Sequence, residues 1–198
     1  QQDKVRLLID PTSSYAQAAA MAMGRAMDDV IIAAATGTAF TGETGATSTA
    51  AQTAIAAGGA GLTIAKLRTA KQTFDLASVD PSIPRHIVVG PEQITNLLST
   101  TEVTSSDFNT VKALVQGEID SFLGFKFTVS NRLAKSGNDR TCIAFAQDGI
   151  TLAIGKDVSA RIDERADKSY ATQVYYCQSI GSTRMEEAKV LGIVCQEA

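Results

Sequence analysis

Residues 12–36 carry the strongest periodic pattern of the chain. Small and apolar side chains recur there at intervals of three and four, as along one face of an α-helix: Tyr15, Ala18, Ala22, Met23, Ala26, Val30 and Ala33. Pro11 suits the first turn of a helix and Gly37 suits its end. The pattern therefore predicts a helix about 35 Å long at 1.5 Å per residue, slim enough for a neighbouring element to approach closely.

Residues 36–61 break this pattern. The segment has seven Thr and only one charged residue, Glu43, and its apolar positions follow no clear period. We expect a mostly irregular excursion with a short hairpin around Gly42–Gly45, where the glycines suit a tight turn.

Between residues 62 and 117, helical spacing surrounds one short apolar run. The run "HIVVG" is typical of a central strand, and prolines punctuate the segment on either side of it. The predicted elements are helices over 62–79, from Pro91 onward and over 105–117, with a strand at 86–90.

The last third of the chain alternates apolar and polar residues, the period of a half-buried strand. We expect strands at 125–129, 141–146, 150–155, 158–165, 172–180 and 188–197, with a polar turn at 181–187, and an extended entry at residues 1–10. Helices followed by a run of strands predict an α+β fold with much antiparallel sheet.

Composition narrows the class of protein. Hydrophobic residues make up 44% and charged residues 20%, as in a globular domain, and the net charge is −3. A mildly acidic chain is not built to grip nucleic acid over a wide basic face. Lys66, Arg68 and Lys71 form only a weak basic patch, which we expect to be solvated surface. Charges in the middle of the first helix argue against a membrane span there.

The cysteines indicate neither a disulfide framework nor a zinc site. Cys142, Cys177 and Cys195 are odd in number and form no C-x-x-C pair. We expect buried free thiols, with a Cys177–Cys195 bridge across two strands as the lesser alternative. The first residue is Gln1 rather than Met, which suggests truncation or processing.

No set of residues assembles into a catalytic, cofactor or metal site. His86, the only histidine, opens an apolar strand and is best read as structural. The glycines at 58–61 precede a helix but lack the G-K-S/T of a phosphate loop, so a linker is the better interpretation. Arg25 lies three residues before Asp28 and four before Asp29, a spacing that favours ion pairing along the helix or to another subunit.

Four segments, in order along the chain, resemble tailed-bacteriophage major capsid proteins. "YAQAAAMAMGRAMDDVIIAAATG" resembles their spine helix, with its G-R-x-x-D-D-x-I-x-x-A pattern, and "PRHIVVGPEQITNLLSTTEVTSSDF" resembles the strand–proline–helix unit of their second domain. "GEIDSFLGFKFTVSNRL" is similar to the turn and strand that follow, and "GSTRMEEAKVLGIVCQE" to the closing strand pair.

The resemblance implies an α+β phage capsid-type fold with two domains. A peripheral P domain (1–60 and 156–198) would hold the spine helix at about 12–36 and a long β-ribbon. An axial A domain (61–155) would hold a mixed sheet with flanking helices. Members of the family carry an N-terminal arm and an extended loop before the spine helix, where only about ten residues precede it here.

The resemblance also implies a function without an enzymatic reaction or cofactor. The chain would be a major capsid protein that self-assembles, as hexamers and pentamers, into an icosahedral shell. The shell would enclose double-stranded DNA without sequence-specific binding, alongside other capsid or portal proteins and without a membrane. Its location would be the virion, with assembly in the host cytoplasm. Arg25, Asp28 and Asp29 are the candidate subunit-interface residues.

Two alternatives stay open. An encapsulating nanocompartment has the same fold and no genome, and a docking pocket for a cargo peptide would distinguish it. A small α/β ligand-binding domain or enzyme would use His86 or the glycines at 58–61.

Overall fold

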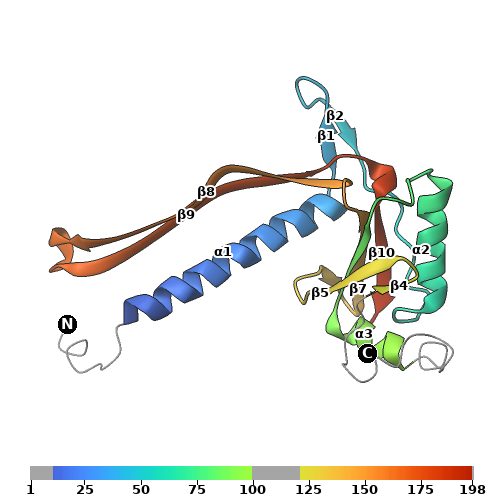
Figure 1. Ribbon diagram of the computed structural model, residues 1–198, viewed down its shortest axis with the longest axis horizontal. Coiled ribbons are helices and arrows are strands. Elements are labelled where there is room, and N and C mark those ends of the chain that lie inside the picture. Colours follow the sequence, from blue (N-terminus) through green and yellow to red (C-terminus); the bar gives the residue numbers. More distant parts are fainter. Residues whose placement is uncertain (1–10, 100–120, 198) are drawn as a thin grey trace. The chain divides into compact units, whose positions relative to one another are not determined.

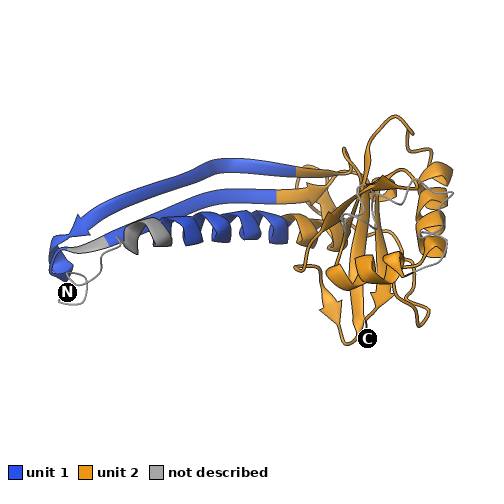
Figure 2. Cartoon of the chain, turned by 60° about the horizontal axis from the view of Figure 1, so that its bottom comes forward, with its two compact units in different colours: residues 1–30, 152–181 blue, residues 31–151, 182–198 orange. Residues whose placement is uncertain are grey.

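The computed structural model describes residues 11–99 and 121–197. The extended entry expected at 1–10 and the helix expected at 105–117 lie outside these residues. The chain divides into two compact units (Figure 2): unit 1 within residues 1–30 and 152–181, and unit 2 within 31–151 and 182–198. The predicted α+β fold class is confirmed.

The described part of unit 1 consists of most of one helix and most of one strand pair. Helix α1 (Pro11–Thr36) begins in unit 1 and ends in unit 2. Strands β8 (Ile150–Arg165) and β9 (Ala171–Arg184) pair as a two-stranded ribbon, joined by the 3₁₀ turn η2 (Ala166–Lys168) (Figure 1). Such a short connection makes the pair antiparallel.

Helix α1 ends where the sequence predicts. The Gly37 amide donates to the carbonyl oxygen of Ala33 at 2.8 Å. A Cβ at Gly37 would lie 2.7 Å from that same oxygen, closer than a side chain tolerates. Glycine at this position therefore allows the chain to leave the helix and turn away.

The ribbon is longer than the sequence pattern predicts. The two strands expected at 150–155 and 158–165 are one continuous strand, because alternation passes through Lys156 and Asp157 without a breaker. The turn expected at 181–187 is also wrong in its first half, since residues 181–184 belong to β9. The Ser182 hydroxyl donates to the Thr151 carbonyl at 3.0 Å, which ties that end of the ribbon together.

Unit 2 is built on a six-stranded sheet in the order β10-β7-β3-β5-β4, with β6 paired to β7. Strand β3 pairs parallel to β5 and antiparallel to β7. The strands are β3 (Arg85–Val89), β4 (Ser121–Phe122), β5 (Phe125–Val129), β6 (Lys135–Ser136), β7 (Asp139–Ala146) and β10 (Val190–Gln196).

The described residues of unit 2 also form two helices besides the end of α1, and a separate hairpin. The helices are α2 (Ile64–Leu76) and α3 (Pro91–Leu98), and the 3₁₀ turn η3 (Glu187–Lys189) precedes β10. The predicted hairpin is present as β1 (Ala39–Thr41) and β2 (Thr47–Thr49), an antiparallel pair outside the main sheet.

The hydrophobic core lies in unit 2, around the sheet and α2. Ile87 and Val89 of the central strand β3 are fully buried, as are Leu67 and Phe74 of α2. The Phe74 ring contacts Phe125 of β5 with centroids 6.0 Å apart. This core gives unit 2 a stability of its own.

Candidate assembly surface

The described part of unit 1 has no buried core of its own. None of its side chains that the structure describes, over 15–30, 152–170 and 173–181, is buried. A two-stranded ribbon is marginally stable in water when nothing covers it. Unit 1 therefore depends on contacts beyond its own side chains.

One face of the ribbon is apolar and exposed. Ile154, Val158 and Ile162 are spaced four residues apart on β8, so their side chains point to the same face. Their exposed fractions are 53%, 39% and 55%. Tyr175 of β9 is 50% exposed as well, but it lines a pocket with Ser159, Arg161 and Asp163 and therefore lies on the opposite face. Exposed apolar side chains gathered on one face, here interrupted by Lys156, are typical of a surface that binds another protein.

The charged residues predicted to lie at an interface are on α1. Arg25 and Asp28 are exposed and Asp29 is partly buried. Within the described part of the chain, Arg25 and Asp28 form no ion pair with each other, although their spacing would permit one. The charges of Arg25 and Asp28 are thus available to another molecule.

Polar contacts join the ribbon internally and to α1. The Gln178 side-chain amide donates to the carbonyl oxygen of Met23 at 3.4 Å. Ser159 Oγ lies 3.0 Å from Cys177 Sγ. The Ser159 hydroxyl and then Lys156 stabilise the thiolate and lower the pKa of Cys177 to about 7, and Cys177 in turn raises the pKa of Lys156.

A buried arginine holds the end of α1 within unit 2. Arg184, at the end of β9, is 4% exposed. Its Nη1 donates to the carbonyl oxygens of Ala35 at 3.2 Å and Gly37 at 2.8 Å, and its Nη2 to that of Thr49 at 3.1 Å. Helix C-termini carry partial negative charge and unpaired carbonyls. The guanidinium therefore caps α1 and ties it to β2 and β9.

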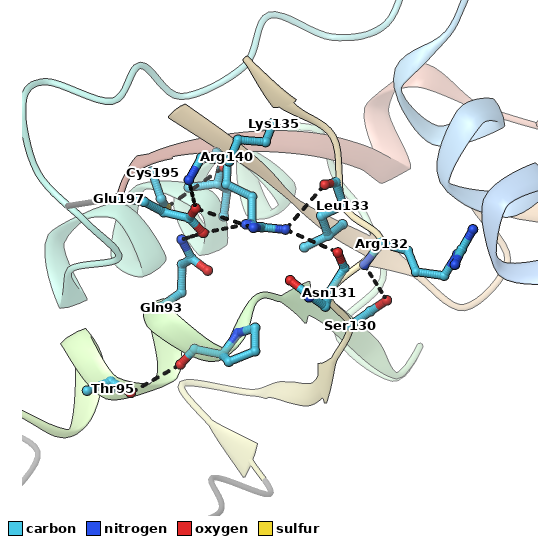
Figure 3. A network of polar contacts seen from close by, with 12 residues as sticks. Gln93, Thr95, Ser130, Asn131, Arg132, Leu133, Lys135, Arg140, Cys195 and Glu197 are labelled. Atoms are coloured by element: carbon cyan, nitrogen blue, oxygen red, sulfur yellow. Dashed lines mark hydrogen bonds and ion pairs between the residues drawn. The ribbon is translucent and has the colours of Figure 1, made fainter. Parts of the chain in front are cut away.

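A second buried network surrounds Glu197 (Figure 3). Its carboxylate accepts hydrogen bonds from Arg140 and from Gln93 Nε2 at 3.1 Å, and it pairs with Lys135 Nζ at 2.5 Å. The hydrogen bonds from Arg140, above all, outweigh burial and lower the pKa of Glu197 to about 2. The network links α3, β6 and β7 to the end of β10.

The glycine-rich loop before α2 holds a cation from its own chain. The buried Lys66 ammonium donates to the carbonyl oxygens of Ala60 at 2.7 Å, Gly61 at 2.9 Å and Val194 at 3.0 Å. A phosphate loop presents N–H groups instead. The expectation that Lys66 belongs to a solvated basic patch is wrong, whereas Arg68 and Lys71 are exposed.

A family model described as phage capsid protein matches residues 1–197. The chain belongs to the phage capsid protein family. A comparison with curated proteins finds no match.

Solved structures of phage capsids share the fold of this capsid protein. A chain of Mycobacterium phage Che8 is 21% identical with a TM-score of 0.70, over 98% of this chain and 66% of that one. The capsid protein of cyanophage P-SCSP1u is 17% identical with a TM-score of 0.72, over 100% of this chain and 70% of that one. The capsid protein of cyanophage Pam1 is 14% identical with a TM-score of 0.69, over 100% of this chain and 72% of that one. The chain thus spans about two thirds of the Che8 chain.

The family and the fold make this protein a structural subunit of a virion capsid. His86, the alternative catalytic candidate, is half-buried and stacks on Phe145 with ring centroids 5.6 Å apart. The described residues contain no cluster of side chains that would hold a metal ion. None of the described helices is long and apolar enough to cross a membrane.

All three cysteines of the capsid protein are free, so the alternative Cys177–Cys195 bridge is not formed. Cys142 and Cys195 are buried, as predicted, whereas Cys177 is partly exposed on the ribbon. Nothing in the sequence pattern marks Arg184 or Glu197 as buried. The sequence did contain a signal for the apolar ribbon face, the alternation through Val158 and Ile162, which by itself predicts a strand and not a partner.

Proposed function

We propose that this capsid protein is the major subunit of an icosahedral shell that encloses double-stranded DNA, and that it carries out no reaction of its own. The observation that carries the proposal is the coreless unit 1. Its exposed ribbon face has no use in an isolated chain, whereas neighbouring copies in a shell would cover it. Family membership supports the same reading.

The partners would be copies of the same chain in hexamers and pentamers, with other capsid or portal proteins, assembled in the host cytoplasm. DNA would be enclosed without sequence-specific binding. The net charge of −3 supports this, and so does the burial of Lys66, which takes one cation out of an already weak basic patch. An acidic lining holds a polyanion only loosely.

Domain roles and interface residues remain proposals as well. The P domain expected at 1–60 and 156–198 and the A domain expected at 61–155 have bounds that differ from those of the compact units, because 31–60 and 182–198 belong to unit 2. Arg25, Asp28 and Asp29 would set the register between neighbouring copies, since charged contacts fix orientation more than affinity.

The ribbon face provides the test. The double variant Ile154→Asp/Ile162→Asp places two charges on the apolar face, and Ala153→Asp places one on the opposite face of the same exposed strand. Burying one isoleucine is worth about 1.5–3 kcal/mol, and a shell repeats that contact at every subunit. We expect negative-stain microscopy to find closed shells for the wild type and Ala153→Asp, and none for the double variant.

The same protein preparations distinguish the genome capsid from the nanocompartment and enzyme alternatives. Circular dichroism must show that all variants keep the fold. Shells of the double variant would show that the ribbon face is not an assembly surface. Nuclease-protected double-stranded DNA inside wild-type shells separates a genome capsid from a nanocompartment. His86→Ala should assemble normally, whereas loss of a turnover activity in that variant would favour the enzyme alternative.

A further inference from the structure

A groove of about 470 Å³ lies on unit 2, beside the C-terminal end of α2. One wall is formed by α2, and the others by residues 78–85 and by the turn at Leu123–Gly124. Val79, Ile83 and Leu123 supply an apolar lining. The volume lies in the range of sites that take a side chain or small ligand.

The charge around this groove is positive. Arg85 Nη2 pairs with the Asp75 carboxylate at 2.7 Å, so the one acidic group in the lining is neutralised. Arg68 and Lys71 are exposed on the adjoining turns of α2 and form no ion pair with any residue that the structure describes. Two unpaired cations beside an apolar lining suit a partner that combines an apolar side chain with a carboxylate.

The backbone is strained where it shapes the groove. Ser78 and Leu123 both line it, and both have left-handed backbone angles, with φ of 57° and 53°. This conformation is costly for residues other than glycine, and such residues cluster where a structure serves a ligand or partner.

The β1–β2 hairpin, also in unit 2, carries an apolar side chain and a carboxylate that would match this groove. Figure 1 shows the hairpin standing away from the six-stranded sheet. Phe40 is 69% exposed there. Glu43, the one charged residue of segment 36–61, is exposed at the turn and has no ion-pair partner among the described residues. The hairpin therefore presents the combination that the groove fits.

We propose that the groove of one subunit receives the β1–β2 hairpin of a second copy, with Phe40 in the groove and Glu43 against Arg68 and Lys71. The proposal rests on the proposed function, since it requires copies to meet. The two surfaces differ, so the contact is heterologous. Repeated from copy to copy, a heterologous contact closes a ring when the rotation allows it, which is the kind of contact that a capsomer needs.

Charge reversal tests the contact in the full chain. Glu43→Arg alone and Arg68→Glu/Lys71→Glu together should each lower the assembled fraction at least tenfold. The triple variant should restore it to within twofold of wild type. Asp163→Arg, a reversal at an exposed site on the opposite face of the ribbon from Ile154, Val158 and Ile162, is the matched control for a general charge effect. Failure of the triple variant to exceed either parent would overturn the inference.

Cross-linking tests it without requiring shells. The variant Phe40→Cys/Leu76→Cys, in a Cys177→Ser background, is treated with glutathione disulfide, so that two protein thiols form one disulfide and release two glutathiones. Leu76 is 77% exposed and lines a pocket that shares Lys71, Asp75 and Leu123 with the groove. Non-reducing gels should show a ladder of linked chains, and much less ladder for Phe40→Cys/Ser136→Cys, whose second site is exposed on β6, at the opposite end of β7 from Arg85.

The outcomes separate the two proposals. A ladder without shells would leave the hairpin contact standing and count against the shell function. Shells without a ladder specific to Phe40→Cys/Leu76→Cys would support the shell function and count against the hairpin contact. Equal ladders for both cysteine pairs would mean random collision and overturn the inference.

Discussion

Removing the charge of Glu197 should destabilise unit 2 in a pH-dependent way. Glu197→Gln keeps the shape of the side chain and a hydrogen-bond acceptor but removes the negative charge. Arg140, whose side chain is 12% exposed, then loses its carboxylate partner, and so does Lys135. An arginine left nearly buried without its partner is itself costly.

The size of the effect follows from the pKa. The Glu197 carboxyl has an ordinary pKa of 4.5, and the network lowers it to about 2. At about 1.4 kcal/mol per pKa unit, the ion pairs and hydrogen bonds contribute at most about 3.5 kcal/mol at neutral pH. Lys135 is 41% exposed and screened by water, so we expect a loss of about 2 kcal/mol.

The sign of the pH dependence is fixed by the direction of the shift. A lowered pKa stabilises the fold above the unfolded-state value of 4.5, and that stability is lost as the pH falls from there through about 2. Urea unfolding of unassembled protein should therefore separate Glu197→Gln from wild type at pH 7 and bring the two together near pH 2. Glu164→Gln, an exposed carboxylate on the ribbon, is the control. An equal gap at both pH values would refute the electrostatic account.

Two further predictions concern Arg184 and Cys177. Arg184→Met should lower the free energy of unfolding by about 2–3 kcal/mol, because buried carbonyls at the end of α1 lose a charged donor; denaturant unfolding measures this, and a loss below about 0.5 kcal/mol would contradict the cap. The rate of Cys177 alkylation by iodoacetamide should rise with a midpoint at about pH 7, and Ser159→Ala should move the midpoint upward. The hydrogen bond with Cys195 and then burial raise the pKa of Cys142, so Cys142 should stay unreactive in the native state. An unchanged midpoint in Ser159→Ala would remove the hydroxyl from the explanation of the Cys177 pKa.

The elements predicted correctly depend on local chemistry. Helix α1 forms from a run of Ala and Met ended by Gly37, and the β1–β2 hairpin turns at Gly42 and Gly45, whose φ angles are 89° and 65°. In both cases residues within one or two turns of each other determine the backbone. A single sequence contains that information.

The polar networks could not be predicted in this way, because their partners are distant in sequence. Arg184 binds carbonyls about 150 residues earlier, and Glu197 binds Gln93, 104 residues away. Nothing in the periodicity of either segment marks these side chains as buried. For Lys66 a signal did exist: it lies four residues before Ala70, on the buried face of α2. Its charge suggested that Lys66 lies on the surface, whereas its position on the helix indicates that it is buried.

The distribution of burial between the two units connects the fold to assembly. Unit 2 has the large apolar core and the buried ion networks, so it can stay folded before copies meet. Unit 1 buries no described side chain, so covering the ribbon face gains free energy only when another chain arrives. In a subunit built in this way, much of the order of unit 1 arises only when the subunit associates with other copies. Hydrogen exchange should therefore be fast in β8 and β9 of unassembled chains and slow in shells, while β3 and β7 stay protected in both states.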